Sequence, residues 1–120
     1  MWTYDQSAGI MSRGGNICGG YSGSGRGKNN PALQAAKGIG PIPAGHWRIV
    51  GPPHDSLTTG PFTLGVVPAA GTNTFGRTAF RIHGDSIAHP GAASHGCIIL
   101  PRAVREAIWA SGDYELTVVA

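Results

Sequence analysis

Glycine supplies 20 of the 120 residues and proline another 9, and no Gly-X-Y period organises them. Both residues interrupt regular elements, so the apolar residues between them can form only short strands and helices. This pattern predicts a mainly all-β fold of six to eight short strands, a small β-sandwich or β-barrel with two short helices. A chain of this length builds one core, and we expect a single domain over residues 1–120.

Strand composition or alternation occurs in five segments: 46–50, 62–67, 78–85, 97–100 and 114–119. One or two further short strands are expected within residues 1–24. We expect Pro52-Pro53 to end the first of these five. The segment 19–30 is almost free of apolar residues and is interpreted as a long surface loop.

Two short helices are predicted from their end signals and periodicity. Asn30 and Pro31 are suited to begin a helix that ends at Gly38. A second helix is expected over about 102–111, where apolar and small residues recur at helical spacing and Gly112 follows.

The charge and hydropathy patterns limit the classes of binding partner and the location of the protein. The net charge of +3 comes from nine scattered Lys and Arg residues with no basic run, which argues against a nucleic-acid partner. No apolar stretch approaches the length of a membrane span. The first twenty residues also lack the apolar core of a secretory signal.

Side chains able to perform chemistry are concentrated between His83 and Cys97. His83 lies on the polar face of the 78–85 segment, and Ser94-His95-Gly96-Cys97 precedes the next predicted strand. A thiol is a strong nucleophile only after it loses its proton, and a neighbouring imidazole can accept that proton. Gly96 allows an unusual backbone angle and close substrate approach, and the N–H groups of Gly96 and Cys97 are then free to hold an oxyanion.

Other interpretations of these residues remain open at this point. A buried cysteine is often only a small apolar side chain, and HG dipeptides are common in turns. His83, Asp85, His95 and Cys97 are all metal-ligand types, although the paired spacing of a structural zinc site is absent. Cys18 is interpreted as a packing residue, or as the partner of Cys97 in an inhibitory disulfide.

The residues His83 and SHGC (94–97) resemble the signature of the L,D-transpeptidase (YkuD-like) family, in which a His precedes [Ser/Thr]-His-Gly-Cys. The motif similarity covers about residues 78–105. Five further segments are similar to a small group of these enzymes that type VI secretion delivers as antibacterial toxins: GKNNPALQ (27–34), GPIPAG (40–45), FGR (75–77), IHGDS (82–86) and GCIILP (96–101).

The resemblance implies a role for each matched residue. Cys97 is the expected nucleophile and His83 the expected general base. The backbone N–H groups of Gly96 and Cys97 are expected to hold the oxyanion. Ser94 and His95 are expected to shape the site and to hold His83 in place.

The implied substrate is a peptidoglycan tetrapeptide stem, attacked before its terminal D-Ala, without a cofactor. The alternative from another functional class is a catalytically inactive cell-wall-binding module that keeps the motif. The implied partner is an immunity protein. The implied location is the periplasm of a target bacterium, which the protein reaches without a signal peptide. We expect the protein to be a monomer.

Two departures from the family pattern affect the substrate. The segment between His83 and Ser94 is short, which favours small acceptors and hence trimming and exchange over cross-linking of two stems. Ile99 occupies a position where many members carry a polar residue or Arg. We therefore expect carboxylate contacts from Lys28, Arg77 or Arg102, and include Asn29 and Asp85 among the substrate-binding candidates.

Overall fold

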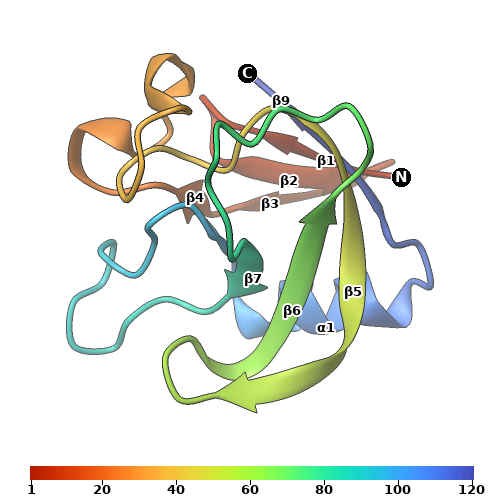
Figure 1. Ribbon diagram of the computed structural model, residues 1–120. Helices are drawn as coiled ribbons and strands as arrows, with labels where there is room; N and C mark the ends of the chain where they lie inside the picture. Colours follow the sequence, from red (N-terminus) through yellow and green to blue (C-terminus); the bar gives the residue numbers. More distant parts are fainter.

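The computed structural model, which describes residues 1–120, contains one nine-stranded sheet with the strand order β3-β2-β1-β9-β5-β6-β7-β8-β4 (Figure 1). Two neighbouring pairs, β1–β9 and β7–β8, are parallel, and the other pairs are antiparallel. The strands are β1 (Trp2–Asp5), β2 (Ile10–Arg13), β3 (Asn16–Gly19), β4 (Tyr21–Ser22), β5 (Gly45–Ser56), β6 (Gly60–Pro68), β7 (Arg81–His83), β8 (Ile98–Ile99) and β9 (Glu115–Val119).

The sheet curls into a nearly closed barrel because its two edge strands are neighbours in the chain. β3 and β4 stand at opposite ends of the strand order, yet only Gly20 separates them. A Cβ atom on Gly20 would lie 2.0 Å from the carbonyl oxygen of Ile99. Glycine is therefore required where the chain crosses from one edge of the sheet to the other.

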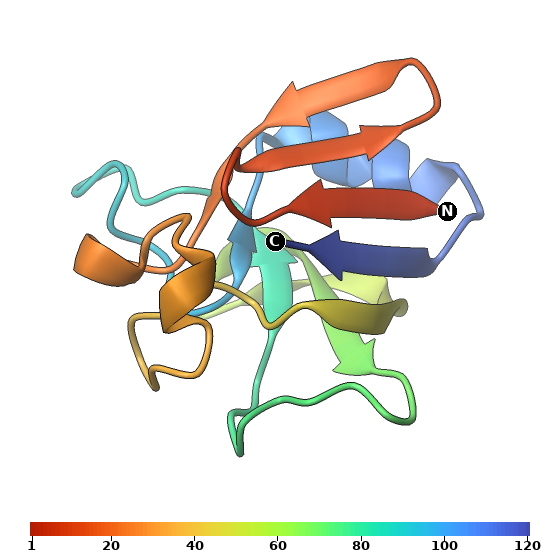
Figure 2. The ribbon, with the colours of Figure 1, turned by 90° about the horizontal axis from the view of Figure 1, so that it is seen from above.

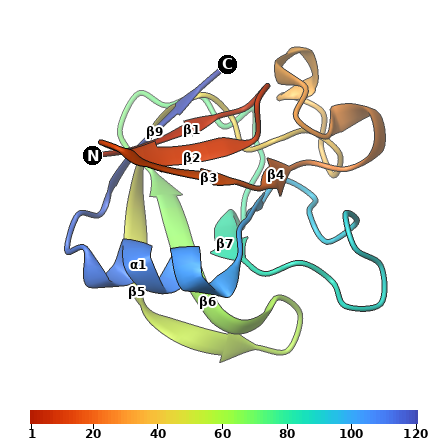
Figure 3. The ribbon, with the colours of Figure 1, turned by 180° about the vertical axis from the view of Figure 1, so that it is seen from behind.

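Alternating apolar residues on these strands build one core inside the barrel. The strand residues that are buried include Trp2, Tyr4, Met11, Trp47, Ile49, Leu64, Val66, Ile82, Ile98, Leu116 and Val118. The single α-helix, α1 (Arg102–Ala110), packs against β6 and β7 on the side of these strands that faces β1–β3, and its Ile108 belongs to the same buried core (Figure 3). It is neither long nor apolar enough to cross a membrane.

The long connections gather at one side of the barrel. The segment 23–44 carries two 3₁₀ helices, η1 (Gly25–Gly27) and η2 (Pro31–Leu33), and the loop 84–97 joins β7 to β8 beside it (Figures 1 and 3). His95 of this loop makes a hydrogen bond through Nδ1 to the Gly38 carbonyl at 3.0 Å. The two connections thus form one wall around the end of β7.

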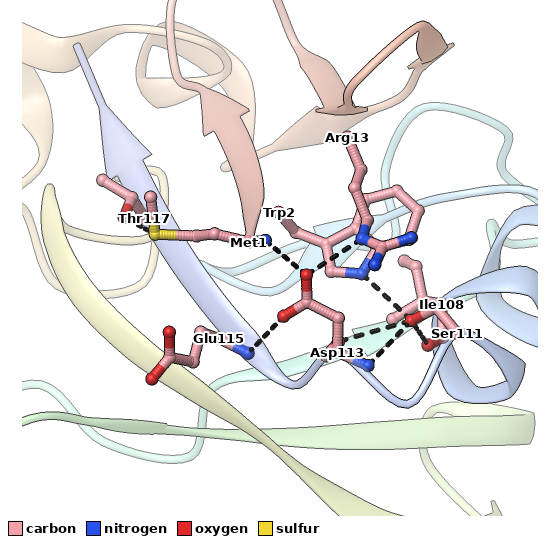
Figure 4. Close-up of polar contacts among 8 residues, drawn as sticks. All are labelled: Met1, Trp2, Arg13, Ile108, Ser111, Asp113, Glu115 and Thr117. Carbon is pink, nitrogen blue, oxygen red and sulfur yellow. Dashed lines mark hydrogen bonds and ion pairs between the residues drawn. The ribbon is translucent and has the colours of Figure 1, made fainter.

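At the opposite side, the turn between α1 and β9 is tied to the first two strands, which lie side by side with β9 in Figure 2. The Asp113 carboxylate accepts a hydrogen bond from Arg13 Nε at 2.9 Å and another from the Met1 amino group (Figure 4). Trp2 Nε1 donates to Ser111 Oγ at 3.4 Å. Hydrogen bonds from the amino terminus and Arg13 lower the pKa of Asp113 to about 2.

The predicted fold class and the C-terminal helix are confirmed, while several element predictions are wrong. β5 continues through Pro52-Pro53 because the prolines fall where the β5–β6 register shifts, between Val50 and His54, so no ladder hydrogen bond is lost. The predicted helix at 30–38 is only the turn η2, which Asn30 caps through its side chain. The predicted loop 19–30 contains β4 and η1, and the N-terminal region forms more strands than expected.

Candidate active site

Cys97 and His83 are brought to the same face of the sheet by the parallel pairing of β7 with β8. Ile82 pairs with Ile98 and His83 with Ile99, so Cys97 is opposite Arg81, just before β8 begins. Ile82 and Ile98 point into the core, and alternation directs Cys97 and His83 to the outer face. Such diagonal neighbours have α-carbons roughly 8 Å apart, a separation that two side chains can span.

Both residues line one cavity of about 550 Å³, which we call the cysteine cavity. Its walls come from residues 77–81 before and within β7, from Ala93 and 95–97 of the following loop, and from Lys37, Gly38, Thr58 and Thr59. This volume is within the range of small-molecule and cofactor sites.

The surroundings of His83 determine which ring nitrogen is free. The side chain is 4% exposed, and Nδ1 lies 2.9 Å from the Gly84 carbonyl oxygen, which can only accept. Nδ1 is therefore the protonated nitrogen, and Nε2 keeps a lone pair for a proton. Burial lowers the pKa of His83, with a smaller contribution from the charges of Arg105 and Arg81, so the ring is neutral at neutral pH.

Cys97 is also neutral at rest. Burial raises the pKa of its thiol, and the Arg81 backbone N–H and the charges of Arg81 and Arg77 only partly offset that rise. The Sγ atom lies 3.7 Å from the carbonyl oxygen of Ala79, whose φ of 64° is unusual for a residue with a side chain. A thiolate formed here faces two arginines, which stabilise it once the proton has moved.

Two buried serine hydroxyls fix the backbone around Cys97. Ser94 Oγ donates to the Cys97 carbonyl at 2.6 Å and accepts from the backbone N–H groups of Gly23 and Gly96. Ser22 Oγ, from β4, donates to the Gly96 carbonyl at 3.1 Å and accepts from the Ile42 N–H at 2.9 Å. Both serines are fully buried, which explains why a small hydroxyl residue is needed at position 94.

The Gly96 N–H was predicted to be free for an oxyanion, and this is wrong, because it donates to Ser94 Oγ at 3.1 Å. The Cys97 N–H has no acceptor within the protein and remains available. Gly96 itself has a φ of 135°, and a Cβ there would lie 2.5 Å from Arg77 Nη2. Glycine is thus required both by its backbone angle and by the guanidinium packed against it.

The guanidinium of Arg77 is 5% exposed and donates to four backbone carbonyls. Nη1 bonds the Gln34 and Pro41 oxygens, and Nη2 bonds the Gly40 and His95 oxygens. Both terminal nitrogens of this predicted substrate ligand are therefore occupied in joining the segment 34–41 to the loop before Cys97.

The remaining predicted substrate residues lie outside the cysteine cavity. Lys28 Nζ lies 4.5 Å from the centre of the Tyr21 ring, and Tyr21 Oη donates to Asp85 at 2.5 Å. Asn29 accepts from the Ser22 N–H through Oδ1. Asp85 and Arg102 line a second cavity, of about 420 Å³, and Lys28 and Asn29 line neither cavity.

A family model named Tlde1 domain matches residues 16–117, which is most of the chain and includes every residue of the cysteine cavity. The chain belongs to the Tlde1 domain family. This family is a type VI secretion effector family, so the type VI part of the sequence-based prediction is confirmed. No curated protein matches the chain, and no solved structure does.

In this Tlde1 domain, sequence reasoning missed three residues near the site. Ser22 supports Gly96, Thr59 borders both cavities, and Arg105 lines the second one. Arg105 was detectable in principle, since it lies three residues before the buried Ile108 on the apolar side of α1. Ser22 and Thr59 carried no local signal.

The metal-binding alternative lacks a ligand set. No group of three or more His, Cys, Asp or Glu side chains lies close enough together to hold a metal ion. His95 is exposed, and its Nδ1 makes a hydrogen bond to the Gly38 carbonyl. The His83 ring bonds the Gly84 carbonyl instead, so no hydrogen bond joins the two histidines. Cys18 and Cys97 are both free thiols, and Cys18 belongs to β3 rather than to the cysteine cavity.

Proposed function

We propose that this Tlde1 domain is a cysteine-dependent L,D-carboxypeptidase and exchange transpeptidase that acts on peptidoglycan tetrapeptide stems. The observation that supports this most directly is that Cys97 and a neutral His83 with a free Nε2 open into one cavity. The similarity of His83 and Ser94–Cys97 to the L,D-transpeptidase signature supplies the substrate class.

In the proposed reaction, His83 Nε2 takes the proton of the Cys97 thiol as Sγ attacks the carbonyl carbon before the terminal D-Ala. The developing oxyanion is held by the Cys97 N–H, and the Arg77 and Arg81 charges add to its stabilisation. The C–N bond then breaks, and the D-Ala nitrogen leaves with the proton from His83. The product is a thioester between Cys97 and the shortened stem.

The acceptor for this thioester is proposed to be small. Water gives a tripeptide stem, and a free D-amino acid gives an exchanged stem, with His83 removing the acceptor's proton in either case. The loop 84–97 and the segment 23–44 form a wall beside the cavity, which limits the space for a second stem. Dimeric stems as the main product would contradict this part of the proposal.

The first test is mass spectrometry of a disaccharide-tetrapeptide incubated with the protein, with and without a free D-amino acid. Wild-type protein should remove or replace the terminal D-Ala, and Cys97→Ala should do neither. Cys18→Ala is the matched control, because Cys18 is the other free thiol and belongs to β3, away from the cavity. Unchanged substrate with folded wild-type protein would favour a cell-wall-binding module.

We further propose that the protein acts in the periplasm of a rival bacterium and that an immunity protein restrains it there. The type VI effector family supports delivery into target cells. Expression of the protein in a bacterial host with a periplasmic export signal should inhibit growth, whereas cytoplasmic expression should not. Equal toxicity in both compartments, or toxicity retained by Cys97→Ala, would contradict a wall-directed thiol mechanism.

A further inference from the structure

Arg105 is a buried cation whose guanidinium is only partly used by the fold. The residue is 5% exposed, and its Nε donates to the Leu100 carbonyl at 3.1 Å. Its Nη1 donates to the carbonyls of Pro61 and Phe62 at 2.7 and 2.8 Å. Nη2 has no acceptor in the protein, and Arg105 lines the second cavity of about 420 Å³, which we call the arginine cavity.

No carboxylate of the protein neutralises Arg105. Glu106 pairs with Arg102 on the exposed side of α1. Asp85, which borders the same cavity, instead accepts hydrogen bonds from Tyr21 Oη and from the N–H groups of Ser86 and Gly91. A buried guanidinium with free N–H donors and no acidic partner is suited to bind an anionic group of a ligand.

The free nitrogen lies beside the candidate general base. A Cβ on Gly84 would be 2.7 Å from Arg105 Nη2, and Gly84 directly follows His83. Thr59 borders both the arginine cavity and the cysteine cavity, so the two adjoin at this point. A ligand that extends past His83, away from Cys97, therefore comes within reach of Nη2.

We propose that Arg105 Nη2 binds the carboxylate of a D-amino acid, either the one that leaves the stem or the one that enters during exchange. This inference rests on the proposed function. His83 must deliver a proton to the leaving nitrogen, so the leaving group lies on the His83 side of the scissile bond. In an α-amino acid the carboxylate is attached to the carbon next to that nitrogen. In the proposed arrangement, this carboxylate lies on the side of His83 where Gly84 and Arg105 Nη2 are found.

This arrangement makes Arg105 a specificity-determining residue. The fold uses Nε and Nη1 to hold the guanidinium in place, and the charge-assisted hydrogen bond from Nη2 selects a terminal carboxylate. Losing such a bond to a charged group reduces the rate on the order of 30-fold. Longer peptides, in which that carboxylate is an amide, should be processed correspondingly poorly.

The test compares two stems that differ only in their terminus, a D-Ala carboxylate and a D-Ala carboxamide. Wild-type kcat/KM should favour the carboxylate by about 30-fold, and Arg105→Gln should reduce that preference to near unity. A merely structural role would lower both rates equally and preserve the ratio. Arg48→Gln, which removes a charge from an exposed position on β5 outside both cavities, should also preserve it.

Gly84→Ala keeps the proposal falsifiable if Arg105→Gln unfolds. Its methyl group crowds Nη2 while leaving the backbone acceptors of Arg105 intact, and it should also abolish the preference. A preference that survives in both variants, or that is absent from the wild type, overturns the inference. Turnover of neither stem by folded wild-type protein instead overturns the proposed function, and the inference with it.

Discussion

The two cavities differ in how their buried arginines are used. In the cysteine cavity both terminal nitrogens of Arg77 bond backbone carbonyls, and the guanidinium joins segments that are distant in sequence. In the arginine cavity the fold uses Nε and Nη1 of Arg105 and leaves Nη2 without an acceptor. The same side chain is thus a structural clamp in one place and a candidate ligand contact in the other, and only the hydrogen-bond partners distinguish them.

The largest effect is expected from His83→Gln, which tests whether the chemistry belongs to the cysteine cavity. Loss of the general base should lower kcat/KM by about 10³-fold. Stability should change little, because the ring's only hydrogen bond is to the neighbouring Gly84 carbonyl. Rate measurements on the tetrapeptide stem, paired with thermal unfolding, check this. Near-wild-type turnover would remove His83 from the mechanism.

Arg77→Met should produce the largest loss of stability. It leaves buried carbonyls without donors and should lower the free energy of unfolding by about 3 kcal/mol. Urea unfolding monitored by circular dichroism measures this, with Arg102→Met as the matched control. Arg102 is exposed, and its contacts are the Glu106 carboxylate at 3.7 Å and the Phe62 ring at 5.4 Å, so its loss should cost less than about 0.5 kcal/mol. Equal losses in both variants would contradict the structural role of Arg77.

The pH dependence of Cys97 alkylation tests whether the thiol in the cysteine cavity is protonated at rest. Burial raises the pKa of the thiol above its ordinary value of 9.0. In a Cys18→Ala background, the iodoacetamide rate should therefore rise about tenfold per pH unit through neutrality and still be rising at pH 9. A fast rate that is independent of pH between 6 and 8 would instead indicate a thiolate–imidazolium pair.

The smallest effect is expected far from both cavities, at the Asp113 contacts with Arg13 and the amino terminus. Because the folded-state pKa of Asp113 is lowered from 3.8 to about 2, its stabilising contribution is complete above pH 3.8 and is lost as the pH falls toward 2. Asp113→Asn should lower the Tm slightly at pH 7, and the difference should vanish below pH 2. A pH-independent difference would point to packing instead of charge.

Local sequence was sufficient to predict part of the site. The motif Ser94–Cys97 and the upstream His83 fall just before β8 and at the end of β7, and short-range alternation directs their side chains. Helical periodicity predicts a helix over about 102–111 for the same reason, and α1 occupies Arg102–Ala110. By contrast, the end of β5 was missed, because pairing with β6 carries that strand through two prolines.

The sequence by itself determined the mainly β fold, the type VI effector family, and the residue types that can carry the chemistry, because these depend on composition and on short motifs. Only the tertiary structure decided that the Gly96 N–H is occupied by Ser94, that Ser22 supports the loop before Cys97, and that Arg77 and Arg105 play different parts. Except for the Ser94 contact, these roles depend on hydrogen bonds to residues that lie far apart along the chain. Such bonds arise when the barrel closes and leave no periodic or local trace in the sequence.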